Sequence, residues 1–112
     1  MIHERIINDN KWIFTCHYWE TTNKWGHEVR LHRNGYEVAK ARIRYYNRTW
    51  ESYQYRSCML KAVETLQRKA HEVAIERWKA ENDKSRTTVA QKVAIYENDP
   101  YCMELRELRH SI

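Results

Sequence analysis

Residues 36–56, YEVAKARIRYYNRTWESYQYR, constrain the fold of this chain more than any other segment. In the first half, apolar and basic residues alternate with the two-residue period of a half-buried β-strand. The strand runs directly into Asn-Arg-Thr-Trp-Glu, where Asn47 or Thr49 can cap a helix and Glu51 complements its positive end. The segment therefore predicts a strand followed at once by a helix. One face of the strand carries a row of basic residues: Lys40, Arg42 and Arg44.

An Asn-Gly pair separates this strand from an earlier alternating segment and predicts a β-hairpin over residues 27–46. Two registers are open. A two-residue loop would pair Val29 with Lys40 and mix charged with apolar side chains. A three-residue loop, with Gly35 left-handed in a β-bulge, pairs Val29 with Ala39 and separates the two kinds of residue. We expect the second register.

This register sorts the side chains of the hairpin onto two faces. We expect Glu28 and Glu37 on the apolar side, which would leave the basic face without acidic residues. The apolar face would carry Val29, Leu31, Ala39, Ala41, Ile43 and Tyr45. The opposite face would carry Arg30, His32, Val38, Lys40, Arg42 and Arg44.

The rest of the chain predicts one more strand and several helices. Residues 11–20 alternate and are rich in aromatic side chains, which is typical of a strand, whereas residues 1–10 suit either a short strand or one helical turn. From Trp50 onward, apolar residues recur at spacings of three and four and indicate a long amphipathic helix. Thr87 or Thr88 can cap a second helix carrying Val89, Val93 and Tyr96, and Asp99-Pro100 begins a third. Trp50 and Leu66 should be buried between the long helix and the sheet. The apolar residues that recur along this helix at spacings of three and four are Met59, Ala62, Val63, Leu66, Ala70, Val73, Ala74 and Trp78.

We therefore predict an α+β fold with the order β-β-β-α-α-α, as one domain over residues 1–112. A three-stranded antiparallel sheet (residues 11–46) is backed by one long helix (residues 50–81). C-terminal helices (residues 87–110) complete the domain.

Cysteine usage and hydropathy indicate the compartment. The chain has three cysteines without a CxxC pair, and we expect no secretory leader, so we expect free thiols in a reducing compartment. No apolar run approaches the ~18 residues needed to span a bilayer. We therefore expect a soluble, intracellular protein with no membrane partner.

Enzymatic and metal-binding motifs are absent from the sequence. The chain has only two glycines and no GxSxG, GxGxxG or GxxxxGK[ST] motif, so no phosphate-cradling loop is expected. It has no closely spaced pair of zinc ligands, and the position four residues after His71 is Ile75. We expect no catalytic residue, no metal and no cofactor.

The basic face of the hairpin is the candidate binding site. The net charge is +5, and a row of Lys and Arg can neutralise successive phosphates or a carboxylate patch. Tyr, Trp and Arg also dominate the energetics of protein contacts. A solvent-exposed sheet face also needs polar residues, and Lys and Arg are common there. The row of basic residues therefore also fits a face that binds no partner. The candidate contact residues are Trp19, Arg30, Lys40, Arg42, Arg44, Tyr46 and Arg48.

Residues 42–55, R-x-R-Y-Y-N-R-T-W-E-S-Y-x-Y, resemble a recurrent stretch in small uncharacterised accessory proteins of phages and prophages of Gram-positive bacteria. In those proteins a hairpin ending in Tyr is followed by N-R-T-W-E-x-Y and a helix, and the likeness covers residues 36–66. It implies a mobile-element origin and the cytoplasm of a bacterial host cell. Accessory genes of this kind often encode inhibitors of host defence, among them anti-CRISPR proteins. The basic charge of this chain differs from that of acidic inhibitors that mimic DNA.

From the residues and this resemblance, we expect a non-enzymatic phage or prophage protein. It would inhibit a host defence protein or nucleoprotein complex, such as a CRISPR effector, by stoichiometric binding. The alternative is a small basic accessory protein that binds DNA or RNA by itself. A structural protein of the virion has little specific support in the sequence.

Overall fold

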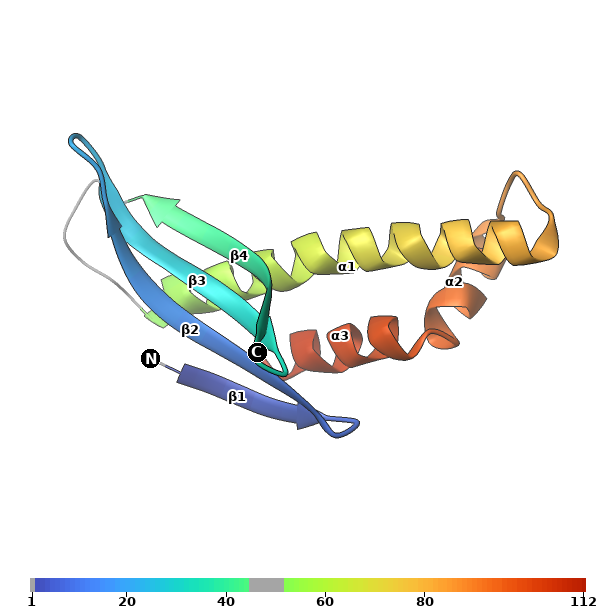
Figure 1. The fold of residues 1–112 in the computed structure, drawn as a ribbon, viewed down its shortest axis with the longest axis horizontal. Helices are drawn as coiled ribbons and strands as arrows, with labels where there is room; N and C mark the ends of the chain where they lie inside the picture. The colour runs from blue at the N-terminus through green and yellow to red at the C-terminus, as the bar shows by residue number, and fades with distance from the viewer. Residues whose placement is uncertain (1, 45–51) are drawn as a thin grey trace.

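The computed structural model describes residues 2–44 and 52–112 of the chain. These residues form four strands, β1 (Ile2–Ile7), β2 (Asn10–Glu20), β3 (Trp25–Arg33) and β4 (Tyr36–Arg44). They also form three helices, α1 (Ser52–Asn82), α2 (Val89–Glu97) and α3 (Pro100–His110). The strands make one antiparallel sheet in chain order. The predicted α+β fold, an antiparallel sheet packed against a long helix and followed by further helices, is confirmed (Figure 1).

The sheet has four strands instead of the predicted three, because the ambiguous N-terminal residues form β1. Asn8 and Asp9 have φ angles of 51° and 64° and close a tight turn between β1 and β2. Asn and Asp tolerate this left-handed conformation, and such turns match the twist of antiparallel strands. Ile7 is buried and Ile6 is 69% exposed, as the alternation of a strand requires. The sheet therefore begins at Ile2 and not at residue 11.

The β3–β4 hairpin closes with a two-residue turn at Asn34 and Gly35, so the predicted three-residue loop is wrong. Gly35 has a φ of 87°, which confirms its predicted left-handed conformation. Val29 pairs with Ala41 and not with Ala39, because the extra residue lies later in the strand, at a bulge that skips residue 38. A shift of two residues leaves Ala39 and Ala41 on the predicted face, whereas Val38, predicted on the basic face, packs against the core at the bulge. The predicted apolar grouping of Val29, Leu31, Ala39 and Ala41 is therefore retained.

The core lies between one face of the sheet and the helices α1 and α3. Leu66 is 8% exposed and belongs to this core, as predicted, whereas Trp50 lies outside the described residues. Figure 1 shows α1 and α3 extending together away from the sheet, with α2 at the far end. The largest fully buried side chains of this core are Trp12, Leu31, Leu105, Leu108, Val29, Val63 and Cys58.

Beyond the sheet, α1 packs against α2 and α3 through a smaller cluster of Ala74, Ile95 and Cys102. Val73 belongs to the apolar stripe of α1 but is 56% exposed. On α2, Ile95 is buried while Val89 and Val93 are exposed, because the helix contacts α1 along a narrow strip.

The predicted starts of the last two helices are confirmed by their caps. Thr88 and Gln91 form a reciprocal capping box at the start of α2. Asp99 caps α3 by accepting a hydrogen bond from the Cys102 amide, and Pro100 occupies the first turn. Of the helices in the described part of the chain, none is long and apolar enough to cross a membrane.

Candidate functional site

The sheet face turned away from the core carries four of the predicted contact residues. Trp19 lies on β2, Arg30 on β3, and Lys40 and Arg42 on β4. Arg30 is opposite Lys40, and Glu28 is opposite Arg42, so the charged side chains of β3 and β4 are immediate neighbours. We call this surface the open face, defined by Trp19, Glu28, Arg30, Lys40 and Arg42.

Glu28 lies at the centre of the open face and is only 2% exposed. Arg30 Nε donates to one oxygen of its carboxylate at 2.7 Å, and Arg42 Nε donates to the other at 2.8 Å. Burial by itself raises the pKa of this carboxyl, but the hydrogen bonds from Arg42 and Arg30 outweigh burial and lower it overall. Glu28 is therefore ionised at neutral pH and binds two cations at once.

The prediction that the basic face has no acidic residues is wrong. Residues 28 and 30 are two apart on one strand, and such residues point to the same side of a sheet. Glu37 also reaches this face, with its carboxylate 3.6 Å from Arg30 Nε, because the bulge in β4 places Glu37 opposite His32. The open face therefore carries less net positive charge than predicted.

Arg42 is fixed on two sides. Its Nε binds Glu28, and its guanidinium carbon lies 5.1 Å from the centre of the Trp19 ring, within range of a cation–π contact. Trp19 is itself held by a hydrogen bond of 3.2 Å from its Nε1 to the carbonyl oxygen of His27. The side chains of Arg30 and Arg42 are still 38% and 56% exposed. Within residues 2–44 and 52–112, no hydrogen-bond acceptor for their terminal nitrogens is found.

Polar side chains continue the open face toward β2. The Thr15 hydroxyl lies 2.7 Å from His17 Nε2 and 3.4 Å from His32 Nε2. Lys40 is exposed and forms no ion pair with the described part of the chain. The surface thus combines fixed guanidiniums, an exposed ammonium group and neighbouring imidazoles.

Not every predicted contact residue can be placed. Arg44 is the last residue of β4, and its side chain is not described. Tyr46 and Arg48 lie outside the described residues. Glu28, which sequence reasoning assigned to the wrong face, organises the site. The sequence did hold a signal for the correct face, because Glu28 lies two residues before Arg30 on the same strand.

A second buried carboxylate links the helices to the sheet. Glu104 on α3 is 2% exposed and accepts hydrogen bonds from Trp12 Nε1 at 3.1 Å and from Arg33 Nη2 at 3.2 Å. The Trp12 and Tyr101 rings contact each other, with their centres 5.8 Å apart, and the Arg33 guanidinium carbon lies beside both, 5.6 Å from the centre of the Trp12 ring and 5.1 Å from that of Tyr101. This cluster holds α3 against the end of the sheet.

The buried thiols are poor nucleophiles. Burial raises the pKa of Cys58 to about 11 and that of Cys102 to about 12, so both remain protonated at neutral pH. The three cysteines are free. Within the part of the chain that the structure describes, no group of three or more His, Cys, Asp or Glu side chains is arranged to hold a metal ion.

Comparison of the chain with protein-family models, curated proteins and solved structures found no match.

Proposed function

We propose that this chain is a non-enzymatic protein of a phage or prophage that binds a host defence complex stoichiometrically through the open face. The observation that carries the proposal is the pair of guanidiniums, Arg30 and Arg42, that one buried carboxylate holds on the sheet face opposite the core. The resemblance of residues 42–55 to phage accessory proteins supports the setting, the cytoplasm of a bacterial host.

The arrangement around Glu28 favours binding over stability. A buried ion pair adds little net stability, because desolvation offsets most of the attraction. It does restrict two long side chains, so less entropy is lost when their terminal nitrogens bind a partner. Planar guanidiniums match phosphate and carboxylate groups, which they bind through two parallel hydrogen bonds. The open face therefore suits an anionic partner surface.

The acidic residues of the open face narrow the choice of partner. Glu28 and Glu37 offset part of the charge of Arg30, Lys40 and Arg42. Binding to any nucleic acid is driven mainly by the number of phosphates that the protein neutralises. A surface of mixed charge depends more on shape and on specific contacts, which favours a nucleoprotein or protein target such as a CRISPR effector with its guide RNA.

The second candidate function, binding of DNA or RNA alone, is favoured by Trp19. Proteins that bind single-stranded nucleic acids often combine an aromatic side chain with lysine and arginine. A base stacks on the aromatic ring, and the phosphates pair with the cations. The guanidinium of Arg42 already covers one side of the Trp19 ring, and a base can stack on that planar group.

The experiment uses the tagged full chain against CRISPR effector–guide RNA complexes of Gram-positive bacteria and against labelled single- and double-stranded RNA and DNA. The test variant is Lys40→Glu, because Lys40 is exposed and supports no buried group. Arg42→Glu is unsuitable, since it would place a second carboxylate beside buried Glu28. Arg68→Glu, at an exposed position on α1, is the matched control.

If the proposal is right, the tagged protein captures an effector complex. The complex stays bound after nuclease has digested the nucleic acid that the effector does not protect. Lys40→Glu should weaken capture by about tenfold, and Arg68→Glu should leave it unchanged. Binding to free nucleic acid alone, with a steep loss as salt rises, would replace the proposal by the second candidate. Capture that Lys40→Glu does not alter would remove the open face from the site.

A further inference from the structure

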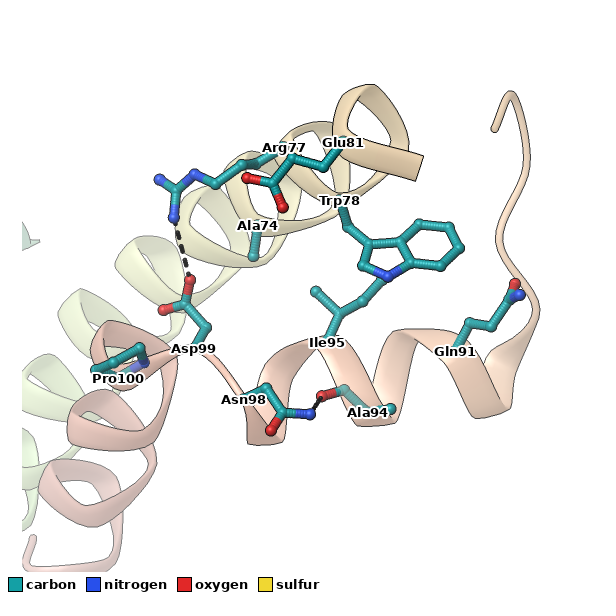
Figure 2. A pocket seen from close by; sticks show the side chains of 10 residues that line it. All are labelled: Ala74, Arg77, Trp78, Glu81, Gln91, Ala94, Ile95, Asn98, Asp99 and Pro100. Atoms are coloured by element: carbon teal, nitrogen blue, oxygen red, sulfur yellow. Dashed lines mark hydrogen bonds and ion pairs between the residues drawn. The ribbon is translucent and has the colours of Figure 1, made fainter. Parts of the chain in front are cut away.

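Two surface grooves lie end to end along α1, on the far side of the core from the open face. The first, of about 490 Å³, lies beside the sheet and is lined by residues of β3, α1 and α3; we call it the proximal groove. The second, of about 390 Å³, lies between the end of α1 and the segment containing α2; we call it the distal groove (Figure 2). Both are lined by Arg77, Asp99 and Pro100, so they meet at the Arg77–Asp99 ion pair.

The two grooves together form a track that follows α1 over several helical turns. From Leu66 in the proximal groove to Glu81 in the distal groove, α1 rises about 22 Å. An extended peptide of about seven residues has this length. The ion pair between the grooves is a weak barrier, because Arg77 is 61% exposed and lies 3.6 Å from Asp99.

The proximal groove has more hydrogen-bond donors than free acceptors. Its carboxylates are already engaged, Glu104 by Trp12 and Arg33, and Asp99 by the Cys102 amide and Arg77. Arg33 Nε is buried without an acceptor, and Lys69 has no ion pair, among the residues that the structure describes. Arg33 Nε is itself out of reach of a ligand, but the Lys69 ammonium and the exposed part of the Arg33 guanidinium would attract a carboxylate from a ligand.

Apolar surface continues through both grooves. Val73 lines the proximal groove and is 56% exposed. Figure 2 shows the Trp78 ring reaching from α1 toward Ile95 on α2, and these two side chains form the apolar wall of the distal groove. Glu81 lines the same groove and disfavours a second carboxylate at that end.

We propose that the track binds a peptide segment of a partner protein, with an acidic side chain in the proximal groove and an apolar or aromatic side chain against Trp78. The positive charges of Lys69 and Arg33 attract the acidic side chain to the proximal groove. The negative charge of Glu81 keeps that side chain out of the distal groove. This surface is separate from the open face, so the protein can hold two partners or two parts of one complex.

The test is selection of a random peptide library, displayed on phage, against the full-length protein. Enriched peptides are then synthesised with a fluorescent label, and their affinity is measured by anisotropy. The variants are Lys69→Glu, which reverses the free charge, and Val73→Glu, which places a carboxylate on the exposed apolar surface. Arg68→Glu is the control, since Arg68 neighbours Lys69 on α1 and lines neither groove. Circular dichroism checks that each variant is folded.

The expected peptides are acidic at one end and apolar or aromatic at the other, and both variants weaken their binding by about tenfold or more. Arg68→Glu and the open-face variant Lys40→Glu leave the affinity unchanged, which separates this inference from the proposed function. Failure to enrich any peptide overturns the inference. Enrichment of basic peptides, or of peptides whose binding neither Lys69→Glu nor Val73→Glu affects, also overturns it.

Discussion

Replacement of Glu104 by methionine should destabilise the protein more than any other single charge removal on α3. Methionine has a similar size and shape, so the change removes the carboxylate without opening a large cavity. Trp12 is fully buried, and its Nε1 would lose its acceptor at 3.1 Å. An unsatisfied buried donor costs about 1–3 kcal/mol.

Arg33 adds a second contribution to the cost. Its guanidinium would lose the carboxylate at 3.2 Å while remaining beside the rings of Trp12 and Tyr101. Breaking a fully buried ion pair costs about 3–5 kcal/mol, but the Arg33 side chain is 28% exposed, and water screens much of this loss. A contribution of about 1 kcal/mol is appropriate for such a pair. The free energy of unfolding should therefore fall by about 2–4 kcal/mol in total.

Urea denaturation followed by circular dichroism measures this change directly. Glu104→Gln should cost about 1 kcal/mol, because its amide oxygen can still accept from Trp12. Glu107→Met, at an exposed position on the same helix, is the control and should stay within ~0.5 kcal/mol of the wild type. If Glu104→Met also stays within ~0.5 kcal/mol, the carboxylate does not hold α3 to the sheet, and the reasoning fails.

Two further predictions concern the sheet. Because the folded state lowers the pKa of Glu28 below its ordinary 4.5, the carboxylate stabilises the protein above that pH and ceases to do so as the pH falls through the folded pKa. The stability gap between wild type and Glu28→Gln, measured by urea unfolding, should therefore shrink from neutral pH to about pH 3; a constant gap would contradict this. Gly35→Val should lower the free energy of unfolding by about 1 kcal/mol or more, through backbone strain alone, because nothing lies within 4 Å of the added Cβ. Gly35→Asn is the control and should cost less, and an unchanged melting temperature for Gly35→Val would show that φ is not positive there.

The hairpin shows how far local sequence signals reach. Asn34-Gly35 and the alternation around it predicted the position of the turn, the left-handed Gly35 and the apolar face, since all depend on residues a few positions apart. The register at Val29 was wrong by two residues, because the bulge lies at residue 38 and not at the turn, and the local alternation did not specify its position. Packing of Val38 against the core accompanies the bulge that is observed.

The alternation of the strands predicted which basic residues share a face of the sheet, but not the electrostatics of that face. Arg30, Lys40 and Arg42 lie on one face, as the alternation indicates. Glu28 is buried between Arg30 and Arg42. This burial depends on the pairing of β3 with β4, which brings Arg42 opposite Glu28. A list of basic residues thus overestimated the positive charge of the surface.

The sequence alone determined the elements whose causes are local. The period of the apolar residues predicted α1, and the capping residues Thr88 and Asp99 predicted the starts of α2 and α3, because capping and helical hydrogen bonds join residues three or four apart. Only the tertiary structure decided that Ile2–Ile7 is a strand, that Glu104 accepts from Trp12 and Arg33, and that two grooves meet at Arg77 and Asp99. Those contacts join residues far apart in the chain. Their partners depend on how the helices and the sheet pack, which no local pattern specifies.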